Sequence, residues 1–146
     1  MNAAATDRNG DTIMLAKEIV MNTKEVGQKL VELCQKGENV QAINALYSHD
    51  VVSVEASTGP DHPMAEIKGI DVVRKKTEEW GANNEVHSGE VQGPFPNGDR
   101  FAVVFKYETT PKNGPMKGKR MTLHEVGIYT VKGGKIAKEE FFYDMG

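Results

Sequence analysis

The chain has almost no cysteine. Cys34 is the only one among 146 residues, so no internal disulfide can form and packing alone must hold the fold together. A chain of this length is the usual size of one domain and can bury a sizeable core without crosslinks. Cys34 lies among apolar residues at helical spacing and is interpreted as a core side chain. A single unpaired cysteine fits a reducing compartment, and we expect a cytoplasmic protein.

Long apolar runs and a strong excess of one charge are also missing. No stretch is apolar enough to span a bilayer, and residues 1–11 lack the basic and apolar parts of a secretory signal. The 18 basic and 21 acidic residues leave a net charge of −3, which gives no electrostatic basis for binding nucleic acid or an anionic membrane. We therefore expect one soluble domain over residues 13–146, preceded by a loose tail at residues 1–12.

Motifs for metals and nucleotide phosphates are absent from the sequence. No two of the 4 histidines have the spacing of a zinc site, and a lone cysteine cannot complete one. The chain also lacks the glycine-rich phosphate loops, and the pair Gly133–Gly134 is interpreted as a turn. We expect no metal and no cofactor.

Helical patterns are concentrated in the first half of the chain. Apolar residues recur every three or four positions over Thr23–Lys36, Val40–Tyr47 and Asp71–Trp80, which predicts three helices. A glycine follows the first and third patterns, as is typical of helix ends. Thr12–Val20 has a similar spacing and is predicted either to extend the first helix backwards or to form a separate one.

Strand patterns fill the second half. A β-branched run at Val51–Glu55 predicts a strand, and the loop Ala56–Lys68 after it is long enough to form the lid or rim of a pocket. Four more strands are predicted, at Glu85–Gln92, Phe101–Thr110, Met121–Val131 and Ile136–Tyr143, with glycine and proline ending the first of them. Short turns join these four, which indicates an antiparallel meander. Segregated helices and strands favour an α+β fold.

Neither face of the predicted sheet is simply polar. On Phe101–Thr110, one face carries Val103 and the other carries Ala102 and Val104. A sheet with one face in water should alternate more cleanly between polar and apolar residues. We therefore expect one face to pack on the helices and the other, which includes His124, to pack on a second copy of the chain. The protein is predicted to be a homodimer through this sheet.

Four segments carry a resemblance to a known family. They are Ala45–Ala56, Ile67–Lys76, Gly93–Phe105 and Gly127–Tyr143. In their order and spacing the chain resembles the nuclear transport factor 2-like superfamily, and within it the SnoaL-like, ketosteroid-isomerase-like branch. The resemblance implies a cystatin-like fold, in which a cone-shaped, curved antiparallel sheet wraps around N-terminal helices and lines an apolar pocket. Because this fold hosts enzymes, binders and scaffolds alike, it says little about function.

The resemblance also implies which residues point into the pocket. Glu55 falls where the isomerases place their general-base aspartate, and His87 falls on the pocket-facing side of the next strand. In an apolar cone the Glu55 carboxylate would lose hydration and become a stronger base. The remaining pocket-lining positions are aromatic or acidic: Trp80, Phe105, Tyr107, Glu125, Tyr129, Glu139, Phe141 and Tyr143.

Two positions depart from the isomerase pattern. Leu30 stands where the resemblance expects the tyrosine of the oxyanion hole, and Gly127 stands where it expects the second oxyanion acid. Losing one donor of an oxyanion hole typically costs roughly 100- to 1,000-fold in rate. The chain is therefore not expected to be a standard ketosteroid isomerase.

The candidate residues also have plain structural interpretations. Glu55 could be solvated at the rim or bind backbone N–H groups of the loop that follows it. His87 could be paired with a carboxylate on a neighbouring strand or lie on a sheet edge. Several acids in one apolar pocket are costly unless paired or protonated, so Glu125 and Glu139 either have partners or face the other way after a one-residue slip.

Three functions therefore stay open. The first is a cofactor-free isomerase, cyclase or hydratase that acts on a small apolar or aromatic ligand, with Glu55 as base and His87 or Tyr107 assisting. The second is a non-catalytic dimeric protein that sequesters or senses such a ligand. The third is a dimeric scaffold whose pocket is only a core. The sequence favours a SnoaL-like small-molecule-binding protein and leaves its status as an enzyme undecided.

Overall fold

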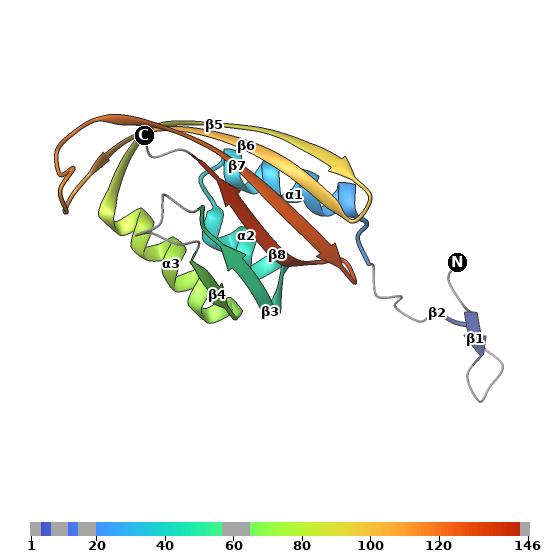
Figure 1. The fold of residues 1–146 in the computed structure, drawn as a ribbon. Coiled ribbons are helices and arrows are strands. Elements are labelled where there is room, and N and C mark those ends of the chain that lie inside the picture. Colours follow the sequence, from blue (N-terminus) through green and yellow to red (C-terminus); the bar gives the residue numbers. More distant parts are fainter. Residues whose placement is uncertain (1–3, 7–11, 15–19, 57–64, 144–146) are drawn as a thin grey trace.

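A curved sheet with helices packed against it forms the body of the protein (Figure 1). The computed structural model describes residues 4–6, 12–14, 20–56 and 65–143. The helices among these residues are α1 (Thr23–Gln35), α2 (Asn39–Leu46) and α3 (Ile70–Asn83). All three helices predicted from apolar spacing over residues 23–80 are therefore confirmed. None of the described helices is long and apolar enough to cross a membrane.

The strand order of the main sheet is β4–β3–β8–β7–β6–β5, and it corrects one prediction. The bounds are β3 (Tyr47–Val54), β4 (Glu66–Lys68), β5 (Asn84–Asn97), β6 (Arg100–Pro111), β7 (Met121–Lys132) and β8 (Lys135–Phe142). The meander from β5 to β8 is antiparallel as predicted, but β3 and β8 run parallel, so a purely antiparallel sheet is wrong. The long connection between β3 and β8 allows the parallel pairing, which a tight hairpin could not. The α+β class is confirmed.

Two helix and strand boundaries differ from those predicted. Thr12–Met14 forms a strand, β2, that pairs with β1 (Ala4–Thr6), so a helix over residues 12–20 is wrong at its start. Residues 15–19, and most of the tail expected at 1–12, lie outside the described residues. β5 continues through Pro94 to Asn97 instead of ending at the glycine–proline segment. The pairing with β6 shifts between Gln92 and Phe95, and this irregularity accommodates Pro94, which has no backbone N–H to donate to a regular ladder.

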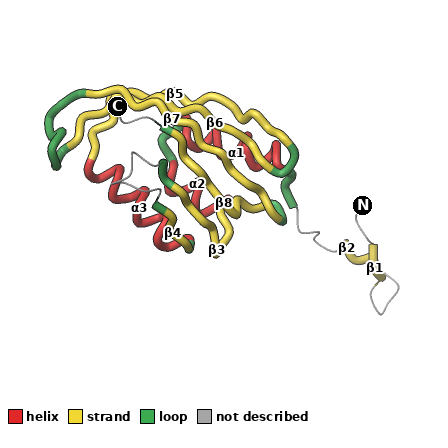
Figure 2. Tube along the Cα trace, in the orientation of Figure 1, coloured by secondary structure: helices red, strands yellow, loops and turns green. Residues whose placement is uncertain are grey.

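The helices lie against one face of the sheet. Figure 2 shows α1 and α2 behind the strands, and α3 beside β3 and β4 at the sheet's edge. Part of the loop expected at Ala56–Lys68 is β4, and residues 57–64 lie outside the described residues. The helical layer is what encloses the inner face of β6, β7 and β8.

Local sequence explains where α1 begins and how closely it packs. The Asn22 side chain accepts a hydrogen bond from the Glu25 backbone at 2.9 Å, and the Glu25 carboxylate accepts one from the Asn22 backbone at 3.1 Å. This reciprocal cap satisfies two helix N–H groups that would otherwise lack partners. Gly27 faces the sheet, where a Cβ would lie 2.7 Å from Cβ of Pro94. The absence of a side chain at Gly27 therefore lets α1 approach β5.

Alternation along β6 and β7 fixes which residues face the helices. Phe101, Val103 and Phe105 are 1%, 0% and 4% exposed, and Tyr129 on β7 is 2% exposed. Phe105 and Tyr129, which the resemblance places inward, thus lie on the buried side of the sheet. The rings of Phe101 and Tyr129 stack with centroids 5.0 Å apart, which closes the core beneath α1.

Replacing Gly27 with alanine should destabilise the protein, although alanine is the better helix former by about 1 kcal/mol. The new methyl group would overlap Pro94 at 2.7 Å, and overpacking of this kind costs about 1–3 kcal/mol. Gly81→Ala in α3 is the matched control, because no atom lies within 4 Å of a Cβ built there. Thermal unfolding should give a lower Tm for Gly27→Ala and an equal or higher Tm for Gly81→Ala. A higher Tm for Gly27→Ala would contradict the close approach.

Candidate functional site

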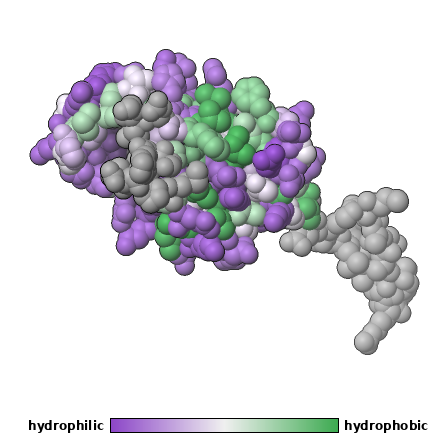
Figure 3. All heavy atoms as spheres, viewed as in Figure 1, coloured by the Kyte–Doolittle hydropathy of each residue, from purple (hydrophilic) through white to green (hydrophobic). Residues whose placement is uncertain are grey.

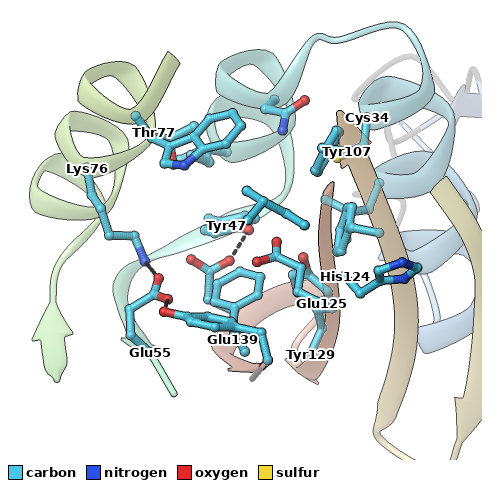
Figure 4. Close-up of a pocket in the computed structure, with 18 of the residues that line it drawn as sticks. Cys34, Tyr47, Glu55, Lys76, Thr77, Tyr107, His124, Glu125, Tyr129 and Glu139 are labelled. Atoms are coloured by element: carbon cyan, nitrogen blue, oxygen red, sulfur yellow. Dashed lines mark hydrogen bonds and ion pairs between the residues drawn. The ribbon is translucent and has the colours of Figure 1, made fainter. Parts of the chain in front are cut away.

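A cavity of about 700 Å³ lies between the inner face of the sheet and the helices. Side chains of α1, α2 and α3 form one wall, and the inward side chains of β6, β7 and β8 form the other. Figure 4 shows the carboxylates of Glu55, Glu125 and Glu139 and the ring of Tyr129 at this space, with Lys76 reaching Glu55 from α3. The cavity therefore combines an apolar surface with ionisable groups.

All eight residues that the sequence assigned to a pocket line this cavity. They are Trp80, Phe105, Tyr107, Glu125, Tyr129, Glu139, Phe141 and Tyr143. The strand pairing explains their convergence, since Phe105 and Glu125 are direct neighbours across β6 and β7. Glu55 lines the cavity just after the end of β3, and His124 borders it with an exposed side chain.

His87 does not line the cavity. Its Nε2 lies 2.7 Å from Oγ1 of Thr110, and its Nδ1 lies 3.9 Å from the carboxylate of Glu85, both on the exposed part of the sheet. The pocket-facing position expected for His87 is wrong because the pairing of β5 with β6 shifts between Val86 and Ser88. Such a bulge adds a residue to one strand and changes the side on which the following residues lie.

An ion pair closes the rim of the cavity. Nζ of Lys76 on α3 lies 2.7 Å from Oε1 of Glu55 and 2.7 Å from Oγ of Ser53. The Tyr143 hydroxyl donates to the other Glu55 oxygen, also at 2.7 Å. The Lys76 and Glu55 side chains are 30% and 31% exposed, so the pair is partly in contact with water. Both Glu55 oxygens are therefore engaged, and Glu55 is not the isolated, unhydrated base that the sequence predicts.

Glu139 lies deeper in the cavity and is 3% exposed. The Tyr47 hydroxyl donates to one of its oxygens, and the Ser53 hydroxyl donates to the other at 2.9 Å. Burial raises the pKa of Glu139, while these donors and the charge of Lys76 oppose that effect. Because Ser53 also accepts from Lys76, hydrogen bonds link Glu139 to the rim ion pair. A carboxyl group in this apolar region is thus tolerated through its partners.

Glu125 is the exception among the cavity's acids. No hydrogen bond or ion pair is made by its carboxyl group among the described residues, and the carboxyl group faces the same space as Glu139 (Figure 4). The pKa of Glu125 is raised from 4.5 to about 7, mainly by burial and also by the nearby charges of Glu55 and Glu139, while the charge of Lys76 opposes these effects. At neutral pH the group is therefore present in both protonation states.

The phenols and the cysteine of the cavity stay protonated at neutral pH. Burial is the main reason that the pKa values of Tyr107 and Tyr129 lie well above that of a free phenol. Burial likewise raises the pKa of Cys34 to about 12, so its thiol is no nucleophile at neutral pH. These phenols can therefore donate hydrogen bonds but cannot act as bases. Among the described residues, no three His, Cys, Asp or Glu side chains are grouped so as to hold a metal ion.

A phenol covers the position where the resemblance expects the second oxyanion acid. A Cβ built on Gly127 would lie 2.8 Å from Cε2 and 3.1 Å from the hydroxyl oxygen of Tyr129. The ring of Tyr129 thus occupies the space that a side chain at Gly127 would need. Leu30, at the other departing position, lines the cavity as an apolar wall. The isomerase's pair of donors is not reproduced at these two positions.

Comparison with known proteins identifies the family. Residues 21–143 match the SnoaL-like domain. A similar solved structure is that of a Mesorhizobium loti protein provisionally assigned as a SnoaL-like polyketide cyclase. It is 43% identical, with a TM-score of 0.76, and the alignment covers 84% of this chain and 100% of that chain.

Two further solved structures are similar at lower identity. An NTF2-like protein from Burkholderia thailandensis is 18% identical with a TM-score of 0.68, over 85% of this chain and 92% of that one. The other is a protein from Catenulispora acidiphila with a ketosteroid isomerase-like fold, in complex with trimethylamine. It is 18% identical with a TM-score of 0.63, and the alignment covers 85% of this chain and 88% of that one. At this identity the likeness shows the fold alone. No curated protein matches the chain.

Substituting Glu125 with glutamine should change how stability depends on pH. Because the pKa of Glu125 rises from 4.5 to about 7 on folding, the native state holds its proton more tightly than the unfolded state does. The stability that this tighter proton binding gives the folded wild type is complete below the pKa that Glu125 has in the unfolded state. It is lost as pH rises through about 7, the pKa of Glu125 in the folded state. The free energy of unfolding of Glu125→Gln, relative to that of the wild type, should therefore rise by up to about 3 kcal/mol from about pH 5 to about pH 8.

Denaturant unfolding at a series of pH values measures this difference. Glu90→Gln is the matched control, because Glu90 lies exposed on β5 and its replacement should give no such trend. A difference between Glu125→Gln and the wild type that stays constant across the pH series would contradict the assigned environment of Glu125.

Proposed function

Because the chain belongs to the SnoaL-like domain family, as its resemblance predicted, we propose that it binds a small molecule in the cavity and moves a proton on it with Glu125. The observation that carries the proposal is the Glu125 carboxyl group, which lines the cavity and has a pKa of about 7. A general base works best when its pKa lies near the working pH. This chemistry needs no cofactor.

Proton abstraction next to a carbonyl group is the reaction class that suits this arrangement. Ionised Glu125 takes a proton from carbon and leaves an enolate. In an isomerisation, protonated Glu125 returns that proton to another carbon of the same molecule. In a cyclisation, the enolate carbon attacks a second carbonyl group and Glu125 protonates the resulting alkoxide. Each proton taken is returned, so neither reaction requires an oxidant or a reductant.

Neutral hydroxyl groups near Glu125 can stabilise the enolate oxygen. Tyr129 follows Glu125 on the same inward side of β7 and lines the cavity. Burial keeps the pKa of Tyr129 well above neutrality, so its hydroxyl remains a donor. A donor aimed at developing charge acts strongly in a site from which water is excluded. In this proposal Tyr129 is the hydrogen-bond donor to the enolate oxygen, a role that the isomerases assign to the positions of Leu30 and Gly127.

Glu55 has a positioning role in this proposal. It holds Lys76 at 2.7 Å, and the charge of Lys76 lowers the pKa of Glu125 against the effect of burial. Losing Glu55 would alter that electrostatic balance without removing the base. The expected effect on turnover is therefore smaller than the effect of losing Glu125.

A non-catalytic ligand-binding protein is the second candidate. It is favoured because several hydrogen-bond donors of the cavity are already bound to groups of the protein itself. Tyr47 donates to Glu139, Tyr143 donates to Glu55, and Lys76 donates to Glu55 and Ser53. These donors stabilise the protein's own carboxylates and are not directed at a ligand. A cavity of this kind could hold an apolar molecule without reacting with it.

The outer face of the sheet supports the proposal of a homodimer. Val104, Val126 and Phe142 are successive cross-strand neighbours, and Ala102 pairs with Ile128 beside them. Phe142 is 50% exposed, and Figure 3 shows hydrophobic surface over the strands on this side of the protein. An apolar strip of this kind is typical of a surface covered by another protein. Sedimentation of a monomer at micromolar concentration would contradict the dimer.

A ligand screen followed by turnover assays tests the proposed function. Flat ketones, phenols and lactones at 100 times their dissociation constants should stabilise the fold by about 2.7 kcal/mol, which a thermal-shift assay detects. For a ligand that is turned over, Glu125→Gln should lower kcat by roughly 100- to 10,000-fold with little change in KM. Glu55→Gln should lower kcat less, and Glu90→Gln should leave kcat unchanged.

Full turnover in a folded Glu125→Gln variant would exclude Glu125 as the base. Ligands that stabilise the wild type without any turnover, and stabilise Glu125→Gln equally, would favour the binding protein over the enzyme.

A further inference from the structure

Acids outnumber bases on the walls of the cavity. Glu55, Glu125 and Glu139 all line it, whereas Lys76 is its one lysine or arginine among the described residues. Lys76 is already matched, because its Nζ lies 2.7 Å from Glu55. Glu125 and Glu139 are therefore left without a cationic partner of their own. Burial raises the pKa of both groups, and hydrogen bonds from Tyr47 and Ser53 compensate Glu139 in part.

Aromatic rings form much of the remaining surface. The rings of Trp80 and Tyr107 lie 6.0 Å apart between centroids and tilt by 50°, so they present differently oriented faces at one end of the cavity. Tyr129 and Phe141 meet edge to face at 6.2 Å on the sheet side. Ring faces carry partial negative charge and attract cations within about 6 Å. One such contact already exists, since Nζ of Lys76 lies 5.3 Å from the centroid of Phe141.

We propose that the ligand of this cavity is an organic cation, an amine bearing an apolar body, whose ammonium group lies beside Glu125 among the aromatic rings. The inference rests on the proposed function for the location of the ligand, and it adds the ligand's chemical class. A tertiary or quaternary ammonium group suits the site best, because it offers charge with little need for hydrogen-bond acceptors. The apolar body would contact walls such as Leu30 and Phe105.

An anionic ligand fits the cavity poorly. It would face three carboxyl groups, and the ammonium group of Lys76 is already bound by Glu55 and Ser53. A neutral ligand could accept a hydrogen bond from protonated Glu125 but would give no counter-charge to the ionised form of the carboxyl group. A cation supplies that counter-charge and takes up the space that the aromatic rings enclose. The charge of the walls therefore selects among ligands of the same shape.

Binding of a cation should be coupled to release of a proton from Glu125. The titratable groups that interact with Glu125 are Glu55 on the β3 side, Lys76 on α3, Tyr107 on β6, Tyr129 on β7, and Glu139 and Tyr143 on the β8 side. A cation beside Glu125 favours its ionised form and so lowers its pKa from about 7. The affinity for a cation should then increase as pH rises through about 7, because less work is needed to ionise the carboxyl group. The affinity for a neutral ligand should not increase in this range.

Isothermal titration with a pair of isosteric compounds tests the inference on the full chain. Phenyltrimethylammonium and tert-butylbenzene have the same shape, differ in charge and do not titrate. The wild type should bind the cation at least about tenfold more tightly at about pH 8, and this preference should decline towards about pH 5.5. Glu125→Gln should lose both the preference and its pH dependence, whereas Glu90→Gln should keep them.

A second variant covers the case in which Glu125→Gln does not fold. Trp80 is 39% exposed, so Trp80→Leu should be tolerated. It should weaken binding of phenyltrimethylammonium several-fold more than binding of tert-butylbenzene, since it removes a ring face but keeps an apolar side chain.

Equal or tighter binding of tert-butylbenzene at every pH would overturn the inference and leave the proposed function standing, because the cavity would still bind a ligand. Failure of both compounds to bind at millimolar concentration would also overturn the inference. In that case the turnover of Glu125→Gln on carbonyl compounds judges the proposed function independently.

Discussion

The site depends on one constraint: strand alternation forces the Glu125 side chain into a space that offers its charge no partner. Glu125 shares the inward side of β7 with Tyr129 and pairs across the sheet with Phe105. Turning its carboxyl group to water would move every inward residue of β7 to the outer face. The carboxyl group therefore stays in the cavity and partly keeps its proton. Both proposals about the cavity follow from this placement, since a half-protonated acid can transfer a proton and can also accept a counter-ion.

Lys76 gives the three acids of the cavity different roles. It forms an ion pair with Glu55 at the rim and reaches Glu139 through the hydroxyl group of Ser53. These contacts leave Glu125 without a direct partner among the described residues. Two carboxylates in different surroundings separate in pKa, and such separation is a common mark of acid–base sites. The same lysine shows that the aromatic walls accept an ammonium group, because it lies over Phe141.

Much of this arrangement could be predicted from the sequence. The family resemblance supplied the order of the helices and strands and placed Phe105, Glu125 and Tyr129 in the pocket. Glu125 could have been singled out earlier, because an acid opposite Phe105 on an inward position has few ways to remain charged. The sequence instead favoured Glu55, whose position matches the base of the isomerases.

The remaining features arise from contacts between distant segments. Nothing in the sequence near Glu55 indicates that Lys76, on a helix beyond an intervening loop, reaches both Glu55 and Ser53. The bulge that turns His87 away from the cavity depends on how β5 pairs with β6, and a regular alternation does not reveal it. The parallel pairing of β3 with β8 likewise depends on strands separated by most of the domain. Each of these features is set by tertiary packing and not by local propensity.

The most direct test of the account is the titration of Glu125 itself. Carbon-13 NMR of the glutamate side-chain carboxyl carbons, with Glu125→Gln to assign the signal, follows its ionisation in the folded protein. The account predicts an apparent pKa near 7 for this signal, displaced downwards when an ammonium ligand binds. A titration near the ordinary glutamate value of about 4.3 would contradict it, because Glu125 would then be an ordinary solvated carboxylate with neither a free proton to transfer at neutral pH nor a need for a counter-ion.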